Sequence, residues 1–180
     1  RRHPHLFELG EAEAWEHIKR RERGGRVLAG IVPTLPSLLM AYRLQERAAS
    51  VGFDWPGLEG PVDKVREELR EVEDQLQAQV ALPPSQSDPN SPGGPPSEQL
   101  IEEIGDLLFT VVNLARKAGV QPGPALDRAN QKFRQRFEII ERLAVERGIE
   151  LSSAGLQVLD GLWDEAKSTG TAGVSAAGRQ

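Results

Sequence analysis

The residues of this chain that are best suited to chemistry are six acids in two short clusters. Each cluster holds two adjacent acids and a third acid three residues further on, among apolar residues at helical spacing. The clusters are Glu67-Glu68-x-x-Glu71 and Glu102-Glu103-x-x-Asp106. Carboxylates forced together where water is scarce repel one another, and a bound divalent cation relieves that repulsion. The pattern therefore predicts a metal site between two helices.

The helical wheel separates the acids of the first cluster. With Val65 at the centre of its apolar stripe and about 100° between residues, Glu68 lies about 60° away and Glu71 about 120° away on the same side. Glu67 falls on the face that points to water. Glu68 and Glu71 are therefore predicted to converge on one ion, since residues three apart are neighbours on a helix surface.

The second cluster repeats this spacing with Glu103 and Asp106, so the two helices could offer four carboxylates. Ligands that are all oxygen atoms favour Mg²⁺ or Mn²⁺ over zinc. The competing interpretation is a set of solvated surface acids paired with bases such as Lys64, and helical spacing alone leaves both open. A carboxylate-bridged di-iron site is excluded, because it needs histidines on these helices and the chain has only His3, His5 and His17.

Helical periodicity recurs along the chain and strand signals are nearly absent, which predicts an all-α fold. The stretch after Ser97 is apolar on most of its circumference, so it should be central and could be shared between subunits. Ser97 can cap it, and Gly119 and Gly148 can end two of the helices. The predicted helices span residues 11–22, 36–48, 62–80, 98–118, 124–147 and 156–168.

Two segments have the composition of irregular chain. Residues 83–96 contain six prolines, two glycines and three serines, which predicts a disordered surface loop. The Gly/Ala/Ser-rich residues 169–180 are predicted to be a disordered tail.

The composition limits the class of protein. A net charge of −5 gives no basic field for a nucleic acid polymer, and no apolar run approaches the length of a membrane span. The chain has no cysteine, which excludes disulfides, thiolate nucleophiles and cysteine-bound metals and fits a cytoplasmic protein. We therefore expect a small-molecule ligand rather than a membrane or a nucleic acid polymer as partner.

Basic and aromatic residues accompany the acids further along the chain. Lys132 and Arg136 lie four residues apart on one predicted helix face, where they could hold phosphate oxygens. Trp163 and Lys167 repeat that spacing, and Trp163 could stack on a base. Each pair could equally be an ordinary helix surface or a packing anchor.

Taken together, these residues resemble the MazG family of nucleoside triphosphate pyrophosphohydrolases, whose signature is E-E-x-x-E followed by E-x-x-D. The resemblance extends over about residues 33–168 and is carried by further segments in family order. These segments are Gly52–Trp55, Gly105–Phe109, Val112–Arg116, Arg128–Phe133 and Trp163–Lys167. The resemblance implies a four- or five-helix bundle that forms a homodimer, binds Mg²⁺ and cleaves nucleoside triphosphates to nucleoside monophosphate and pyrophosphate. It also suggests broad-specificity housecleaning of the nucleotide pool.

The resemblance also implies roles for individual residues. The metal ligands would be Glu68, Glu71, Glu103 and Asp106. The triphosphate and the nucleoside would be held by Lys64, Asn130, Lys132, Arg136, Trp163 and Lys167. Glu67 or Glu102, each beside a proposed ligand, could orient or deprotonate the attacking water, and the sequence does not choose between them.

The chain departs from the family pattern at one point. Thirty-one residues separate Glu71 from Glu103, more than is usual in the family, and the 83–96 segment accounts for the excess. Such a loop should cost little, because closure entropy grows slowly with loop length. Residues 1–32 resemble the segment that follows a first MazG domain in two-domain members, so we expect residues 33–168 to be a second, catalytic domain.

A second function remains open from the sequence. A helical dimer could keep this fold and bind a protein or a nucleotide without turning it over. Measuring pyrophosphate release separates the two functions.

Overall fold

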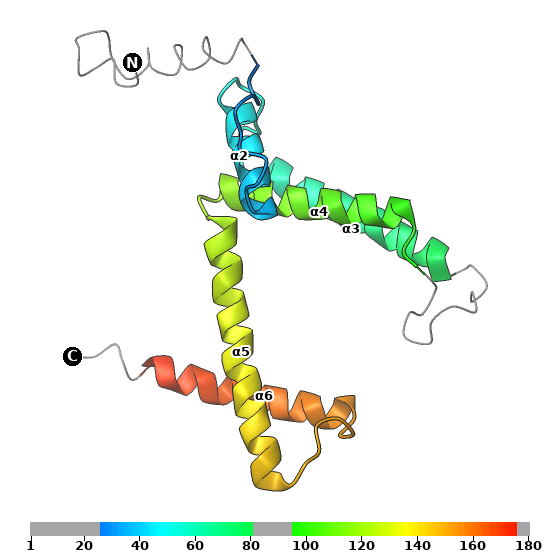
Figure 1. The fold of residues 1–180 in the computed structure, drawn as a ribbon, viewed down its shortest axis with the longest axis vertical. Coiled ribbons are helices and arrows are strands. Elements are labelled where there is room, and N and C mark those ends of the chain that lie inside the picture. The colour runs from blue at the N-terminus through cyan, green and yellow to red at the C-terminus, as the bar shows by residue number, and fades with distance from the viewer. Residues whose placement is uncertain (1–25, 81–94, 176–180) are drawn as a thin grey trace. The chain divides into compact units, whose positions relative to one another are not determined.

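The computed structural model describes residues 26–80 and 95–175. In these ranges the chain forms five helices and no strand, which confirms the all-α prediction (Figure 1). They are α2 (Ser37–Ala49), α3 (Glu59–Val80), α4 (Glu98–Lys117), α5 (Pro122–Arg147) and α6 (Leu156–Ser175). The helix predicted at 11–22 and nearly all of the 83–96 loop lie outside the described residues.

The chain divides into two compact units between Gly123 and Pro124. The first unit contains α2, α3 and α4, and the second contains α6 and nearly all of α5. Every residue of the two acidic clusters belongs to the first unit.

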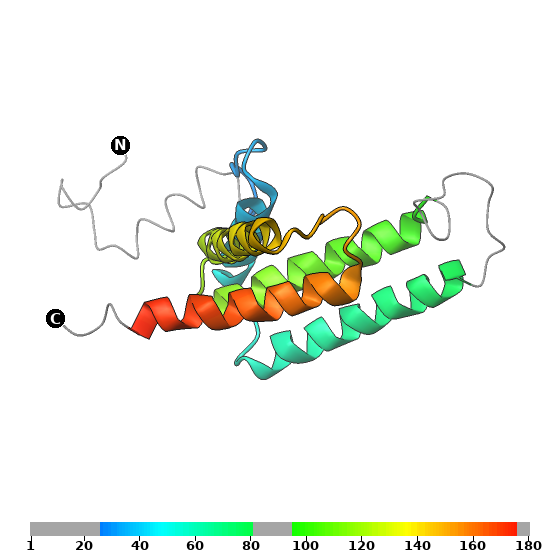
Figure 2. The ribbon, with the colours of Figure 1, turned by 90° about the horizontal axis from the view of Figure 1, so that it is seen from below.

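The first unit is built on an antiparallel pair of long helices. α3 and α4 lie side by side along their length, and α2 packs against α4 (Figures 1 and 2). The apolar residues Val72, Leu100 and Val112 are buried in this unit. Because α4 contacts both neighbours, its predicted central position is confirmed.

Local signals set the ends of α4. The Ser97 hydroxyl accepts a hydrogen bond from the amide of Leu100 at 3.1 Å, as the capping prediction requires. Arg116 and Lys117 lie in the last turn, where positive charge is favourable. Gly119 follows with φ 72°, a conformation that glycine adopts without strain. These features orient the face of α4 that carries Glu103 and Asp106.

The second unit is held together where α5 crosses α6. Ile140 and Ala144 of α5 form a buried cluster with Leu162 and Ala166 of α6. The small side chains at 144 and 166 allow the two backbones to approach closely. The side chains of Arg147 and Glu165 form a doubly hydrogen-bonded ion pair at 2.7 and 2.8 Å beside this contact.

Three helix ends differ from the predicted ones. α3 and α5 begin earlier than expected, at Glu59 and Pro122, because a proline is well tolerated in the first turn of a helix. α6 continues to Ser175, so its predicted end near residue 168 is wrong. The glycines at 170 and 173 weaken a helix without stopping it, and no proline intervenes.

None of the helices in the described part of the chain combines the length and hydropathy that a membrane-crossing helix needs.

Candidate functional site

Three carboxylates from the two long helices meet in the first unit. Oxygen atoms of Glu68 on α3 and of Glu103 and Asp106 on α4 lie within 4.8 Å of one another. Glu68 is buried, with 4% of its surface exposed, while Glu103 is half-buried and Asp106 is exposed. The cluster therefore has one buried carboxylate and an open side toward solvent.

Glu71 borders this cluster. It is exposed, yet partial desolvation and the neighbouring charges of Glu68 and Glu103 raise the pKa of its carboxyl above the usual value. A raised pKa means that the site resists one more negative charge. A bound cation would remove that resistance.

The donor set suits a hard divalent cation. All three clustered side chains offer carboxylate oxygens, and no histidine among the described residues joins them. Hard cations such as Mg²⁺ prefer such ligands and keep several coordination positions for water or phosphate oxygens. Three protein oxygens with an open side leave room for those additional ligands.

Lys64 places a positive charge against the acidic cluster. Its ammonium nitrogen lies 2.8 Å from a carboxylate oxygen of Glu67 and 2.7 Å from one of Glu68. These two contacts raise the pKa of Lys64 well above its usual value, so it stays charged at neutral pH. The predicted surface pairing of the acids with Lys64 is thus real, and it includes the buried acid.

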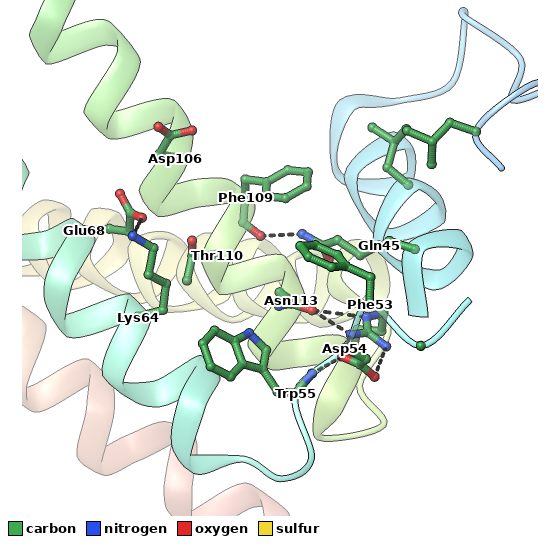
Figure 3. Close-up of a pocket in the computed structure, with 15 residues that line it drawn as sticks. Gln45, Phe53, Asp54, Trp55, Lys64, Glu68, Asp106, Phe109, Thr110 and Asn113 are labelled. Carbon is green, nitrogen blue, oxygen red and sulfur yellow. Dashed lines mark hydrogen bonds and ion pairs between the residues drawn. The ribbon is translucent and has the colours of Figure 1, made fainter. Parts of the chain in front are cut away.

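A cavity of about 840 Å³ opens beside the acids in the first unit. Glu68 and Asp106 line it, together with Lys64 and residues of α2, α4 and the turn before α3 (Figure 3). The described chain has three buried polar residues, and all three line this cavity. They are Gln45, Glu68 and Thr110. Because buried polar side chains are uncommon, their gathering around one space indicates a binding site.

The turn between α2 and α3 forms an aromatic wall of the cavity. Phe53 and Trp55 line the space and are exposed by 82% and 44%. The ring of Trp55 lies directly over Gly60, where the Cβ of any other residue would overlap it. The absence of a side chain at 60 therefore leaves room for the indole at this place.

An ion pair ties this turn to the end of α4. The Arg116 guanidinium donates to both carboxylate oxygens of Asp54, at 2.5 and 3.2 Å. Lys117 donates to Asp54 at 3.3 Å and to the Trp55 carbonyl at 2.7 Å. The Arg116 hydrogen bond is the main cause that lowers the pKa of Asp54, and Asn113 also accepts from Arg116. The turn is thus fastened to α4.

The other predicted nucleotide-binding residues belong to the second unit. The Arg136 guanidinium carbon lies 5.7 Å from the centre of the Trp163 ring, and Phe133 packs on the same ring at 5.3 Å. Lys167 forms an ion pair with Asp164 at 2.6 Å. Asn130 and Lys132 are exposed on α5. Arg136 and Trp163 are therefore brought together, and Trp163 also packs against the apolar cluster of its own unit.

The two candidate bases differ from the proposed metal ligands in their surroundings. Glu67 and Glu102 are exposed, and neither is among the residues that line the cavity.

Two buried polar residues of the cavity, Gln45 and Thr110, were not predicted from the sequence. Gln45 could have been found, because it interrupts the apolar stripe of α2 between Tyr42 and Ala48 at helical spacing.

Comparison with known proteins points to the family that the sequence motifs resemble. Residues 60–139 match the family model described as the MazG nucleotide pyrophosphohydrolase domain. The chain is 38% identical over 178 residues to the nucleoside triphosphate pyrophosphohydrolase of Escherichia coli K12. It is also 38% identical over 175 residues to the Thermotoga maritima nucleoside triphosphate pyrophosphohydrolase/pyrophosphatase MazG.

The shared regions differ in extent between this chain and its relatives. Each match covers 93% of this chain, but the chain spans only 62% of the Escherichia coli protein and 60% of the Thermotoga one. The matched domain contains α3, α4, both acidic clusters and most of α5. The predicted resemblance to the MazG family is confirmed by the domain match over residues 60–139 and by both relatives.

Proposed function

We propose that this chain hydrolyses nucleoside triphosphates to nucleoside monophosphate and pyrophosphate with the help of Mg²⁺. The observation that carries the proposal is the meeting of Glu68, Glu103 and Asp106 beside a cavity lined by buried polar residues. The reaction is the one named for the relatives from Escherichia coli and Thermotoga maritima. Turnover of several nucleoside triphosphates, as housecleaning of the nucleotide pool requires, is part of the proposal.

The acidic residues would hold the metal. Glu68, Glu103 and Asp106 would be ligands, with Glu71 as a fourth, and Mn²⁺ could replace Mg²⁺. A cation bound there would offset the charge of the triphosphate and lower the pKa of a bound water.

A carboxylate beside the ligands would accept the proton of the attacking water. The water oxygen bonds to phosphorus, the bridging bond between the α- and β-phosphates breaks, and pyrophosphate leaves with the electron pair. Glu67 and Glu102 are the candidates for this base, each adjacent in sequence to a proposed ligand. Glu67 also forms an ion pair with Lys64 at 2.8 Å.

The nucleotide-binding roles that the family resemblance implies remain part of the proposal. Lys132 and Arg136 would contact phosphate oxygens and stabilise the charge that builds on the leaving pyrophosphate. Trp163 and Lys167, with Asn130, would help to hold the nucleotide. The guanidinium of Arg136 beside the Trp163 ring supports a shared role for these two residues.

We also propose that the protein is a homodimer and that α4 contributes to the interface. Ile101, Ile104 and Leu108 form an exposed stripe along α4, with 58%, 42% and 56% of their surfaces accessible in the single chain. Apolar stripes of this kind are normally covered in solution. Sedimentation velocity on wild type and Leu108→Arg tests the idea, and a monomeric wild type would refute it.

The hydrolase proposal is tested by following pyrophosphate release with and without Mg²⁺. Wild type should release pyrophosphate from several nucleoside triphosphates, and Glu71→Ala and Asp106→Ala should abolish most of that release while remaining folded. Glu73→Ala is the matched control, because Glu73 is an exposed acid of α3 outside the cluster. Release of orthophosphate, or full activity in both cluster variants, would refute the mechanism.

The non-catalytic binding module has its own signature. Calorimetry would then show nucleotide binding, with or without Mg²⁺, while no pyrophosphate appears. The presence of all four proposed ligands together with Lys132 and Arg136 favours the enzyme.

A further inference from the structure

Gln45 is a buried side chain with one hydrogen-bonding atom unused. Only 7% of its surface is exposed, and its amide nitrogen donates to the carbonyl of Phe109 at 2.8 Å. Its Oε1 atom is buried and accepts no hydrogen bond from any described residue. A buried acceptor without a donor is unfavourable in a folded protein, so this oxygen needs a donor beyond those that the described residues supply.

The cavity offers the route for such a donor. Gln45 lines the same space as Glu68 and Asp106, and Figure 3 shows the two acids toward one side of it and Gln45 with Phe53 toward the other. A triphosphate held near the acids would therefore extend its nucleoside toward Gln45. Phe53 and Trp55 present exposed rings along this wall, on which a base could stack.

The chemistry of the amide limits what Gln45 can recognise. Because the nitrogen is occupied by the Phe109 carbonyl, the group left over is an acceptor. The last torsion of a glutamine side chain is broad, and the proposal requires a rotation about it that turns the buried oxygen toward the cavity. An exocyclic amino group would complement this oxygen, whereas a base carbonyl in the same place would set two acceptors against each other.

We propose that Gln45 selects nucleotides whose base carries an exocyclic amino group at this position, such as cytosine or adenine, over their keto counterparts. The inference rests on the proposed hydrolase function and adds a specificity residue to it. The buried surroundings strengthen the selection, since a buried polar group left unpaired by the wrong substrate penalises that substrate.

The test compares pairs of substrates that differ by this one group. Wild type should show a kcat/KM at least tenfold higher for CTP than for UTP, and for ATP than for ITP. Gln45→Met keeps the length of the side chain and should bring both ratios close to one. Glu46→Ala, an exposed change on the same helix, should leave both ratios unchanged.

The wild-type comparison keeps the inference testable even if Gln45→Met fails to fold. Equal rates within each pair, or a preference for the keto substrates, would overturn it while leaving the hydrolase function intact. Unchanged ratios in a folded Gln45→Met protein would also overturn it. If no triphosphate is hydrolysed, the proposed function fails, and calorimetry with α,β-methylene CTP and UTP then decides the inference: tighter binding of the cytidine analogue supports it, and equal binding refutes it.

Discussion

The ammonium group of Lys64 lies 2.7 Å from a carboxylate oxygen of Glu68, the most deeply buried acid of the cluster. Lys64 also contacts Glu67, so one cation is shared by an acid of the proposed metal site and an acid beside it. Lysine and a metal ion would compete for the charge of Glu68. The lysine is therefore a counter-ion that a bound metal would displace toward the substrate.

The first prediction concerns this competition. Lys64→Met should increase the affinity for Mg²⁺ in the absence of nucleotide by roughly tenfold, as expected for removing one nearby charge. The same change should raise the KM for triphosphates, which lose a cationic partner. Isothermal calorimetry and steady-state kinetics measure the two effects. Arg66→Met is the control, because Arg66 pairs with Asp63 outside the cluster; an equal gain in that variant would contradict the explanation.

The second prediction separates the metal ligands from the candidate bases. Glu68→Gln should weaken Mg²⁺ binding by roughly a hundredfold, since the number of ligand charges governs the affinity of such sites. Glu67→Gln and Glu102→Gln should change it less than about threefold, because both residues are exposed and outside the cluster. Whichever of these two loses kcat while keeping Mg²⁺ affinity is the base, and normal kcat in both would remove them as candidates.

The third prediction concerns the pH dependence of stability. Asp54 has a lowered pKa, mainly through its hydrogen bond from Arg116, so its ion pair stabilises the fold above the ordinary Asp value of 3.8 and is lost as the pH falls through the lowered pKa. Asp54→Asn should reduce the free energy of unfolding by about 1 kcal/mol at pH 7. Urea denaturation should show this difference shrinking at pH 3 and below. A difference that stays constant across this range would show that the contact does not act through charge.

The fourth prediction concerns the position of Trp55. Replacing a helical glycine by alanine usually stabilises a protein by about 0.5–1 kcal/mol. Gly60→Ala should instead destabilise it by about 1–3 kcal/mol, because the added Cβ overlaps the Trp55 ring. Gly105→Ala on α4 is the matched control and should be stabilising, since nothing lies within 4 Å of its added Cβ. Thermal melting compares the two, and a stabilised Gly60→Ala protein would contradict the packing.

Much of the fold could be predicted because its signals are local. The spacing of apolar residues marks each helix, and Ser97, Gly119 and Gly148 mark ends that the structure confirms. The end of α6 was predicted too early, because the glycines at 170 and 173 only weaken a helix. A local pattern cannot measure how far such a helix continues.

The acidic residues of the candidate site could be placed from the sequence. The helical wheel correctly separates buried Glu68 from exposed Glu67, and the spacing of three places Glu103 and Asp106 beside Glu68. The Asp54–Arg116 contact could not be predicted, since it joins residues 62 positions apart with no shared pattern. Such a contact depends on how the helices pack.

One helix serves both ends of the cavity, since α4 carries Asp106 in its middle and Arg116 in its last turn. At the usual rise of a helix these residues lie about 15 Å apart along the axis. Arg116 and Lys117 hold the turn that carries Trp55. The acidic end of the cavity and its aromatic wall are therefore connected by one continuous helix rather than by loops. If the proposed function holds, α4 would set the distance between the phosphate and the base, and a substrate whose sugar or base changes that distance would not fit the carboxylates.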